Sequence, residues 1–133
     1  MSAKTKIVLV VEDERPLLDA IKLKLENSGM EAVTARTVKQ ALSYLEELPT
    51  VDGIWVDHYL LGDEDGLDFV AQVKNEGSRW NQIPVFVVSN TASSEKVMAY
   101  MQFGVSKYFV KANYRLDQII KEIKENLDHE QFE

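Results

Sequence analysis

The chain has 133 residues, of which 45% are hydrophobic and 28% are charged. This size fits one domain of average composition, and the apolar fraction is too high for a disordered chain. The 22 acidic residues outnumber the 15 basic ones and give a formal net charge of −7, which argues against direct nucleic-acid binding. The absence of cysteine excludes disulfides, thiolate metal sites and cysteine nucleophiles.

The longest apolar run near the N-terminus is Ile7–Val11, which is followed at once by three acidic residues. A run of this length is too short for a signal peptide or a membrane span. We therefore expect one domain over residues 1–133, without membrane insertion and in the cytoplasm, which the lack of cysteine also suits. Its core is expected over about residues 6–127, followed by an acidic polar tail over 128–133.

Five short runs of apolar or β-branched residues alternate along the chain with segments of helical periodicity. This alternation is typical of repeated strand–helix–strand units. The first and third runs lack the polar–apolar alternation of half-exposed strands, which favours parallel strands that are covered on both faces. The predicted strands are Ile7–Val11, Glu31–Ala35, Gly53–Val56, Val85–Val88 and Tyr108–Val110.

The segments between and after these runs predict five helices. The first has Pro16 in its opening turn and stops at Gly29. The second begins with a capping box at Thr37 and ends before Pro49. The remaining helices are predicted over about 66–74, 94–103 and 113–127, the last of them capped by Asn113.

Alternating strands and helices of this size predict an α/β fold with helices on both faces of one parallel sheet. Right-handed crossovers leave few topologies for such a chain. We expect a doubly wound sheet of five parallel strands. Ligands of such sheets bind beyond the carboxyl ends of the strands, so the residues that follow each predicted strand are candidates for a functional site.

Charged and hydroxyl residues stand at four of these strand ends. Three carboxylates crowded at one sheet edge repel one another unless a cation joins them, and a small set of hard oxygen ligands suits Mg²⁺. A lysine and a hydroxyl opposite the acids would hold phosphoryl oxygens. The pattern therefore indicates phosphoryl transfer with Mg²⁺. The residues are Glu12 and Asp13 after the first strand, Asp57 after the third, Ser89 after the fourth and Lys111 after the fifth.

In this order and at successive strand ends, these residues and their neighbours resemble the receiver domains of two-component response regulators, the CheY-like family. The resemblance covers about residues 6–127 and implies the flavodoxin-like, CheY-like three-layer fold with the strand order 2-1-3-4-5. The motifs that carry it are Val10-Val11-Glu12-Asp13, Trp55-Val56-Asp57-His58-Tyr59-Leu60, Gly62, Asp65-Gly66-Leu67, Val87-Val88-Ser89 and Tyr108-Phe109-Val110-Lys111.

The resemblance implies that Asp57 accepts a phosphoryl group from a phosphohistidine in the presence of Mg²⁺, for which Mn²⁺ is expected to substitute. Asp13 would bind the metal directly and Glu12 mostly through water, with Asp57 and the backbone carbonyl of Tyr59 as further ligands. Such a domain is a signalling module and not an enzyme with a separate substrate, because it promotes only its own phosphorylation and dephosphorylation.

The other roles implied by the resemblance concern the response to phosphorylation. Lys111 would pair with the phosphoryl group, Ser89 would swing toward it, and Tyr108 would follow inward as an aromatic switch. The phosphoryl donor would be a sensor histidine kinase or a histidine phosphotransfer protein. A downstream protein would bind the face formed by the last two predicted helices and the last strand, and a homodimer through that face is left open.

Some residues near the expected site depart from the family pattern. Ala112 stands where the family has a proline in a cis bond, so the Lys111–Ala112 bond is left open as trans with a shifted loop or cis under strain. Leu61 replaces the customary proline before Gly62, in a loop that looks one residue longer than usual, and Asn90 stands where small residues are common. None of these departures removes a predicted site residue.

A degenerate receiver that docks to proteins without being phosphorylated is the alternative function, because the departures surround the site. A flavin-binding protein of the same topology would need a phosphate loop after the first strand, where Glu12-Asp13-Glu14 would repel a phosphate. Strand alternation points the His58 side chain away from Asp57, which predicts a packed or surface histidine and not a metal ligand. The cognate donor, the output and any further domains stay open.

Overall fold

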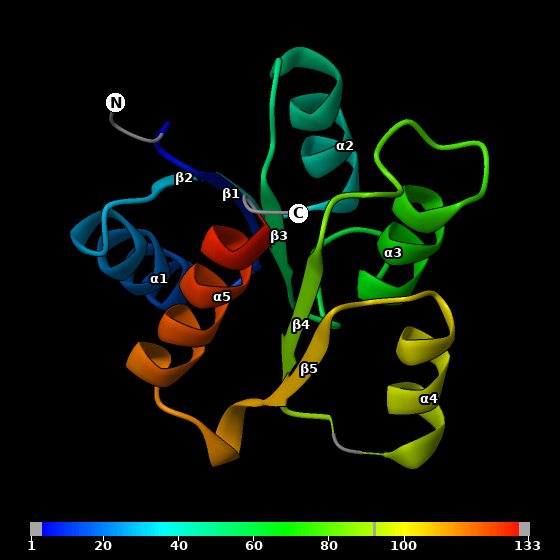
Figure 1. Cartoon of the computed structure of the whole chain (residues 1–133). Coiled ribbons are helices and arrows are strands. Elements are labelled where there is room, and N and C mark those ends of the chain that lie inside the picture. The colour runs from blue at the N-terminus through cyan, green and yellow to red at the C-terminus, as the bar shows by residue number, and fades with distance from the viewer. Residues whose placement is uncertain (1–3, 92, 131–133) are drawn as a thin grey trace.

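A computed structural model describes residues 4–91 and 93–130 of the chain. Strands and helices alternate along it, as the sequence predicts (Figure 1). No helix among the described residues is long and apolar enough to cross a bilayer. In chain order the elements are β1 (Ile7–Val11), α1 (Arg15–Asn27), β2 (Glu31–Ala35), α2 (Val38–Glu47), β3 (Gly53–Val56), α3 (Gly66–Lys74), β4 (Val85–Ser89), α4 (Ser94–Gln102), β5 (Lys107–Val110), the 3₁₀ turn η1 (Lys111–Asn113) and α5 (Leu116–Glu130).

The strands form one five-stranded parallel sheet in the order β2-β1-β3-β4-β5. Helices α1 and α5 cover one face of the sheet, and α2, α3 and α4 cover the other (Figure 1). The predicted doubly wound fold and its strand order are therefore confirmed. The strand order reverses at the pair β1 and β3, which is where ligands of such sheets bind.

The central strands are buried on both sides, because alternate side chains enter two separate hydrophobic clusters. On β1, Val8 and Val10 pack with residues of α1 and α5, whereas Leu9 and Val11 pack with residues of α2, α3 and α4. A strand covered in this way needs apolar residues at every position, which explains the unbroken apolar run in the sequence. The core thus holds the ends of the central strands in fixed positions.

Side-chain caps fix the starts of α2 and α3. Thr37 Oγ1 accepts the backbone N–H of Gln40 at 3.0 Å, so Thr37 caps α2 as predicted. The reciprocal bond of the predicted capping box goes elsewhere, because Gln40 Oε1 accepts the backbone N–H of Arg36 at 2.8 Å. At α3, Asp65 and Asp68 cap each other, and each carboxylate accepts the backbone N–H of the other residue at 2.9 Å. This capping box anchors the loop that follows β3 to the start of α3.

The last helix begins at Leu116, so the prediction that Asn113 caps it was wrong. Asn113 belongs to the turn η1, and Tyr114 after it has an extended backbone that interrupts any helix. The side chain of Gln118 accepts the backbone N–H of Arg115 at 2.8 Å, which stabilises the helix start at this later point.

The same helix continues to Glu130, beyond the end predicted at Leu127. The first part of the predicted polar tail, residues 128–130, is therefore helical. Residues 131–133 lie outside the described part of the chain, so the rest of the tail stays a prediction.

The loop after β5 contains the Lys111–Ala112 peptide bond, which the sequence left open as cis or trans. No peptide bond is cis within residues 4–91 and 93–130, so the bond between Lys111 and Ala112 is trans. The turn η1 closes with a hydrogen bond from the Tyr114 N–H to the Lys111 carbonyl oxygen at 3.4 Å. The alanine is therefore accommodated by a short helical turn directly after the lysine.

Helix α3 begins at Gly66, and the backbone of this glycine packs closely against the residues that follow β3. A Cβ at this position would lie 2.3 Å from the Asp57 carbonyl oxygen, 2.7 Å from the Tyr100 hydroxyl and 2.9 Å from His58 Cα. The N–H of Gly66 also donates to the His58 carbonyl oxygen at 2.8 Å. Only glycine fits this close approach between two backbones.

We expect Gly66→Ala to lower the free energy of unfolding by about 1–3 kcal/mol, because the added methyl group meets backbone atoms that cannot move aside. Gly77→Ala is the matched control, since a Cβ there has no neighbour within 4 Å, and its effect should stay within about 0.5 kcal/mol. Urea unfolding measures both changes. Equal stabilities for the two variants would contradict the close contact at Gly66.

Candidate functional site

The carboxyl edge of the sheet brings together the side chains of Glu12, Asp13 and Asp57. One carboxylate oxygen from each residue lies within 4.8 Å of those of the other two. Glu12 and Asp13 follow β1, and Asp57 follows β3, which pairs with β1 so that Val11 stands opposite Val56. The Asp57 N–H extends this pairing by donating to the Val11 carbonyl oxygen at 3.0 Å. The register of two neighbouring strands therefore sets the positions of the three acids.

Lys111 joins two of these carboxylates. Its Nζ lies 3.0 Å from Glu12 Oε1 and 3.1 Å from Asp57 Oδ2, across sequence separations of 99 and 54 residues. Burial lowers the pKa of Lys111, but the hydrogen bonds and charges of Glu12 and Asp57 outweigh burial and raise the pKa overall. Lys111 therefore remains a charged ammonium group between the two acids.

Glu12 is a buried acid with only 1% of its surface exposed. Burial raises the pKa of Glu12 to about 7, and the negative charge of Asp57 adds to this effect. The contact with Lys111 and a hydrogen bond of 3.1 Å from the Glu14 N–H to Glu12 Oε2 act in the opposite direction. Three carboxylates with one ammonium group leave a surplus of negative charge. This donor set fits Mg²⁺, which prefers oxygen ligands and retains several waters.

Arg36 holds the main chain of Asp13, a contact that was not predicted from the sequence. Its Nε and Nη2 donate to the Asp13 carbonyl oxygen at 3.0 and 2.7 Å. Arg36 directly follows β2, whose last residue, Ala35, accepts the Glu12 N–H at 3.0 Å. The signal in the sequence is faint, because a basic residue after a strand is ordinary and its partner is a backbone atom. The end of β2 nevertheless helps to fix the acidic turn after β1.

His58 contacts Asp57 through its backbone and points its side chain elsewhere. The His58 N–H donates to Asp57 Oδ1 at 2.7 Å, so both oxygens of Asp57 have partners, one in His58 and one in Lys111. The imidazole Nδ1 lies 2.6 Å from the Tyr100 hydroxyl oxygen, and His58 is buried. Of the two predicted placements, packed or at the surface, the structure shows the packed one.

Ser89 and Tyr108 both form hydrogen bonds with the backbone of Thr91. The Thr91 N–H donates to Ser89 Oγ at 3.4 Å, and the Tyr108 hydroxyl donates to the Thr91 carbonyl oxygen at 2.6 Å. Burial raises the pKa of Tyr108, and the Ser89 hydroxyl partly offsets this effect. Among the hydrogen bonds of the described residues, none joins Ser89 to the carboxylates or to Lys111. Ser89 is buried at the end of β4, and its role in the site stays a prediction.

Tyr59 has a largely exposed side chain in the loop between β3 and α3, with 53% of its surface accessible. Its ring packs edge-on against His58, with 4.8 Å between the ring centroids, and Lys96 Nζ lies 5.4 Å from its centre. Asn90, after β4, is also exposed. The role of the Tyr59 backbone carbonyl as a metal ligand stays a prediction.

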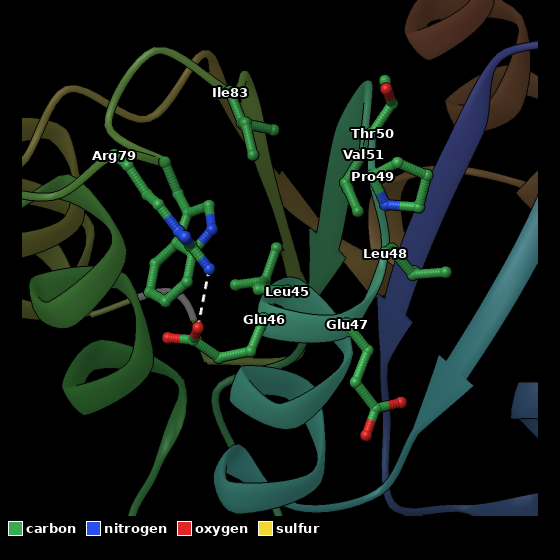
Figure 2. A pocket seen from close by; sticks show the side chains of 10 residues that line it. Leu45, Glu46, Glu47, Leu48, Pro49, Thr50, Val51, Arg79 and Ile83 are labelled. Carbon is green, nitrogen blue, oxygen red and sulfur yellow. Dashed lines mark hydrogen bonds and ion pairs between the residues drawn. The ribbon is translucent and has the colours of Figure 1, made fainter.

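A separate cavity of about 520 Å³ lies at the opposite end of the sheet, before β3 and β4 begin. Figure 2 shows the carboxylate of Glu46, on α2, paired with Arg79 from the loop before β4, and the guanidinium of Arg79 lies over the ring of Trp80. Both charged side chains are 62% exposed, so their ion pair contributes little to stability. The cavity shares no residue with the acidic cluster and is not part of the candidate site.

The chain is similar to a known family and to curated proteins. The family model described as the response regulator receiver domain matches residues 8–124. The phosphate regulon transcriptional regulatory protein PhoB of Escherichia coli is 32% identical over 104 residues, which cover 78% of this chain and 44% of PhoB. The transcriptional regulatory protein KdpE of Mycobacterium tuberculosis is 31% identical over 119 residues, which cover 89% of this chain and 49% of KdpE.

Solved structures agree with this assignment. The phosphorylated cyanobacterial phytochrome response regulator RcpA superposes with a TM-score of 0.82 at 28% identity, over 92% of this chain and 93% of RcpA. A CheY-like receiver domain protein from Methanospirillum hungatei has a TM-score of 0.81 at 25% identity, over 96% of this chain and 98% of that protein. The chain spans less than half the length of the curated relatives PhoB and KdpE. It belongs to the family of response regulator receiver domains.

Proposed function

We propose that the chain is a phosphoacceptor domain in which Asp57 receives a phosphoryl group from a phosphohistidine. The donor is a sensor histidine kinase or a histidine phosphotransfer protein. The observation that carries this proposal is the contact of Lys111 with Glu12 and Asp57, next to Asp13, at the sheet edge where ligands bind. Similarity to the phosphorylated response regulator RcpA supports it.

In the proposed transfer, an oxygen of the Asp57 carboxylate attacks the phosphorus atom. A P–O bond forms, the P–N bond to the donor imidazole breaks, and the imidazole nitrogen keeps the electron pair. Hydrogen bonds from the His58 N–H and from Lys111 orient the carboxylate before the donor arrives. The ammonium group of Lys111 then pairs with the phosphoryl oxygens and stabilises their negative charge.

The residues proposed to hold Mg²⁺ are Glu12, Asp13 and Asp57, with the backbone carbonyl of Tyr59 as a further ligand. Mn²⁺ accepts the same oxygen ligands and is expected to substitute. The bound cation supplies positive charge that offsets repulsion between the carboxylates and the incoming phosphoryl oxygens. Arg36 keeps Asp13 in place, because its guanidinium donates two hydrogen bonds to the carbonyl oxygen of that residue.

Phosphorylation is proposed to change the face formed by α4, β5 and α5. Ser89 approaches the phosphoryl group and Tyr108 follows, because both residues contact Thr91. Such a change needs an element with two arrangements, one of which the phosphoryl group favours. A downstream protein reads this face, and a second copy of the chain is a further candidate partner.

The proposed role is signalling and not catalysis on a separate substrate. The relatives PhoB and KdpE are transcriptional regulatory proteins. We propose a regulatory role for this chain as well, whichever domain or partner carries the output. The net charge of −7 argues against direct nucleic-acid binding by this domain. Phosphoryl transfer from a kinase that draws on ATP agrees with a cytoplasmic location.

Asp57→Asn is expected to abolish phosphoryl uptake, because it removes the carboxylate that forms the acyl phosphate. With Mg²⁺ and a small acyl-phosphate donor, wild type should gain one phosphoryl group, and a chelator should prevent this gain. Intact-mass spectrometry measures both results. Asp63→Asn is the matched control, since Asp63 is an exposed carboxylate in the same loop, and it should behave as wild type.

Equal uptake by wild type and Asp57→Asn would overturn the assignment of the acceptor. No uptake by wild type with Mg²⁺, from the small donor and from phosphohistidine proteins alike, would overturn the proposed function. That result would favour a receiver that docks to its partners without being phosphorylated.

Asp13→Asn is expected to weaken Mg²⁺ binding by more than about tenfold, or ~1.4 kcal/mol, because a half-exposed carboxylate that binds the metal directly is lost. Glu12→Gln should have a smaller effect, since Glu12 is already paired with Lys111 and acts mostly through water. Amide chemical shifts during a Mg²⁺ titration give both affinities. The same loss in both variants would contradict the separate roles of the two acids.

A further inference from the structure

The side chains of a buried histidine and a buried tyrosine form a hydrogen bond next to Asp57. The proposed phosphoryl transfer does not use this bond. His58 Nδ1 lies 2.6 Å from the Tyr100 hydroxyl oxygen. His58 is 5% exposed and Tyr100 is fully buried. Because His58 directly follows Asp57 and Tyr100 belongs to α4, the bond links the acceptor strand to a helix of the proposed output face.

The surroundings of His58 determine which group donates in this bond. Its Nε2 lies 3.7 Å from Asp65 Oδ2, so the ring hydrogen is favoured on Nε2, facing that carboxylate. The Nδ1 atom then accepts the hydrogen of the Tyr100 hydroxyl. Burial raises the pKa of Tyr100, which keeps this hydrogen in place. Asp65 also caps α3, so the bond lies where β3, α3 and α4 meet.

The same histidine holds the acceptor carboxylate. Its backbone N–H donates to Asp57 Oδ1 at 2.7 Å, while its side chain holds Tyr100. Gly66 leaves no free space on this side, because a single added carbon there would meet Asp57, His58 and Tyr100 at once. Because these groups pack closely and the His58 N–H binds the Asp57 carboxylate, we expect a displacement of Asp57 to move His58 and, through it, Tyr100.

This connection to α4 differs from the one through Ser89 and Tyr108. The connection through Ser89 and Tyr108 passes through the backbone of Thr91, whereas the connection described here passes directly from His58 to Tyr100. The rings of Tyr100 and Tyr108 are 5.7 Å apart, so the two routes meet at α4.

We propose that His58 and Tyr100 are positioning residues that transmit the state of Asp57 to α4 by their hydrogen bond, in addition to Ser89 and Tyr108. The inference rests on the proposed phosphorylation of Asp57 and names a second means by which it reaches the output face. Coupling between sites needs a physical element whose equilibrium both sites bias, and we assign this role to the buried bond.

The test compares Tyr100→Phe, which keeps the ring and removes only the hydroxyl, with Tyr44→Phe as the matched control on α2. Each protein receives Mg²⁺ and beryllium fluoride, which mimics a phosphoryl group, and the change in amide shifts over residues 94–102 is recorded. Wild type and Tyr44→Phe should respond fully. Tyr100→Phe should bind the mimic as wild type does, but its response over 94–102 should fall to about half or less.

Variants at His58 provide a second, independent measurement. His58→Leu should lower the response of α4 as Tyr100→Phe does, whereas His58→Asn should restore much of it, because an amide can still bond the Tyr100 hydroxyl. Nitrogen chemical shifts of the imidazole should report a hydrogen on Nε2 in wild type, and Nδ1 should shift in Tyr100→Phe. A contact that only fills space would give none of these differences.

The outcomes separate this inference from the proposed function. If wild type binds the mimic at Asp57 and Tyr100→Phe retains the full response over 94–102, the role of the His58–Tyr100 bond is overturned while the proposed function stands. If wild type neither binds the mimic nor takes up a phosphoryl group, the proposed function itself fails.

Discussion

The balance of charge at the carboxyl edge of the sheet is the constraint on which the rest of the site depends. Three carboxylates meet there, and the ammonium group of Lys111 contacts two of them, those of Glu12 and Asp57. Burial of Glu12 and the charge of Asp57 raise the pKa of Glu12 to about 7, so the lysine alone does not satisfy the acids. The same surplus of negative charge that opposes folding favours a divalent cation and, with it, a phosphoryl group.

The fold supplies the rigidity that this arrangement needs. The central strands are buried on both faces, and Asp57 is held by the Val11 carbonyl, by the His58 N–H and by Lys111. Gly66 brings the start of α3 into contact with the same peptide. An acceptor fixed in this way cannot change its environment alone, because its neighbours on β3, α3 and α4 must adjust together. In the proposed mechanism, the charge added to Asp57 reaches the surface through these neighbours.

Much of this site could be predicted from the sequence, because parallel strands end at one edge and the residue after a strand then has a known place. Glu12, Asp57 and Lys111 each directly follow a strand, and Asp13 comes one residue after Glu12. Two contacts could not be predicted, because no local sequence pattern encodes a contact between distant elements. They are the hydrogen bonds of Arg36 to the Asp13 carbonyl oxygen and the hydrogen bond between Tyr100 and the His58 ring. The predicted helix start at Asn113 was wrong because asparagine commonly caps helices, whereas here Asn113 lies in the turn η1 and α5 begins three residues later.

The most direct test is a crystal structure of the chain with Mg²⁺ and beryllium fluoride. We expect beryllium bonded to a carboxylate oxygen of Asp57, Lys111 Nζ beside a fluorine atom, and Mg²⁺ bound by Asp13 and Asp57. Mg²⁺ and beryllium fluoride bound elsewhere, with Lys111 still joining Glu12 and Asp57 as it does here, would contradict it.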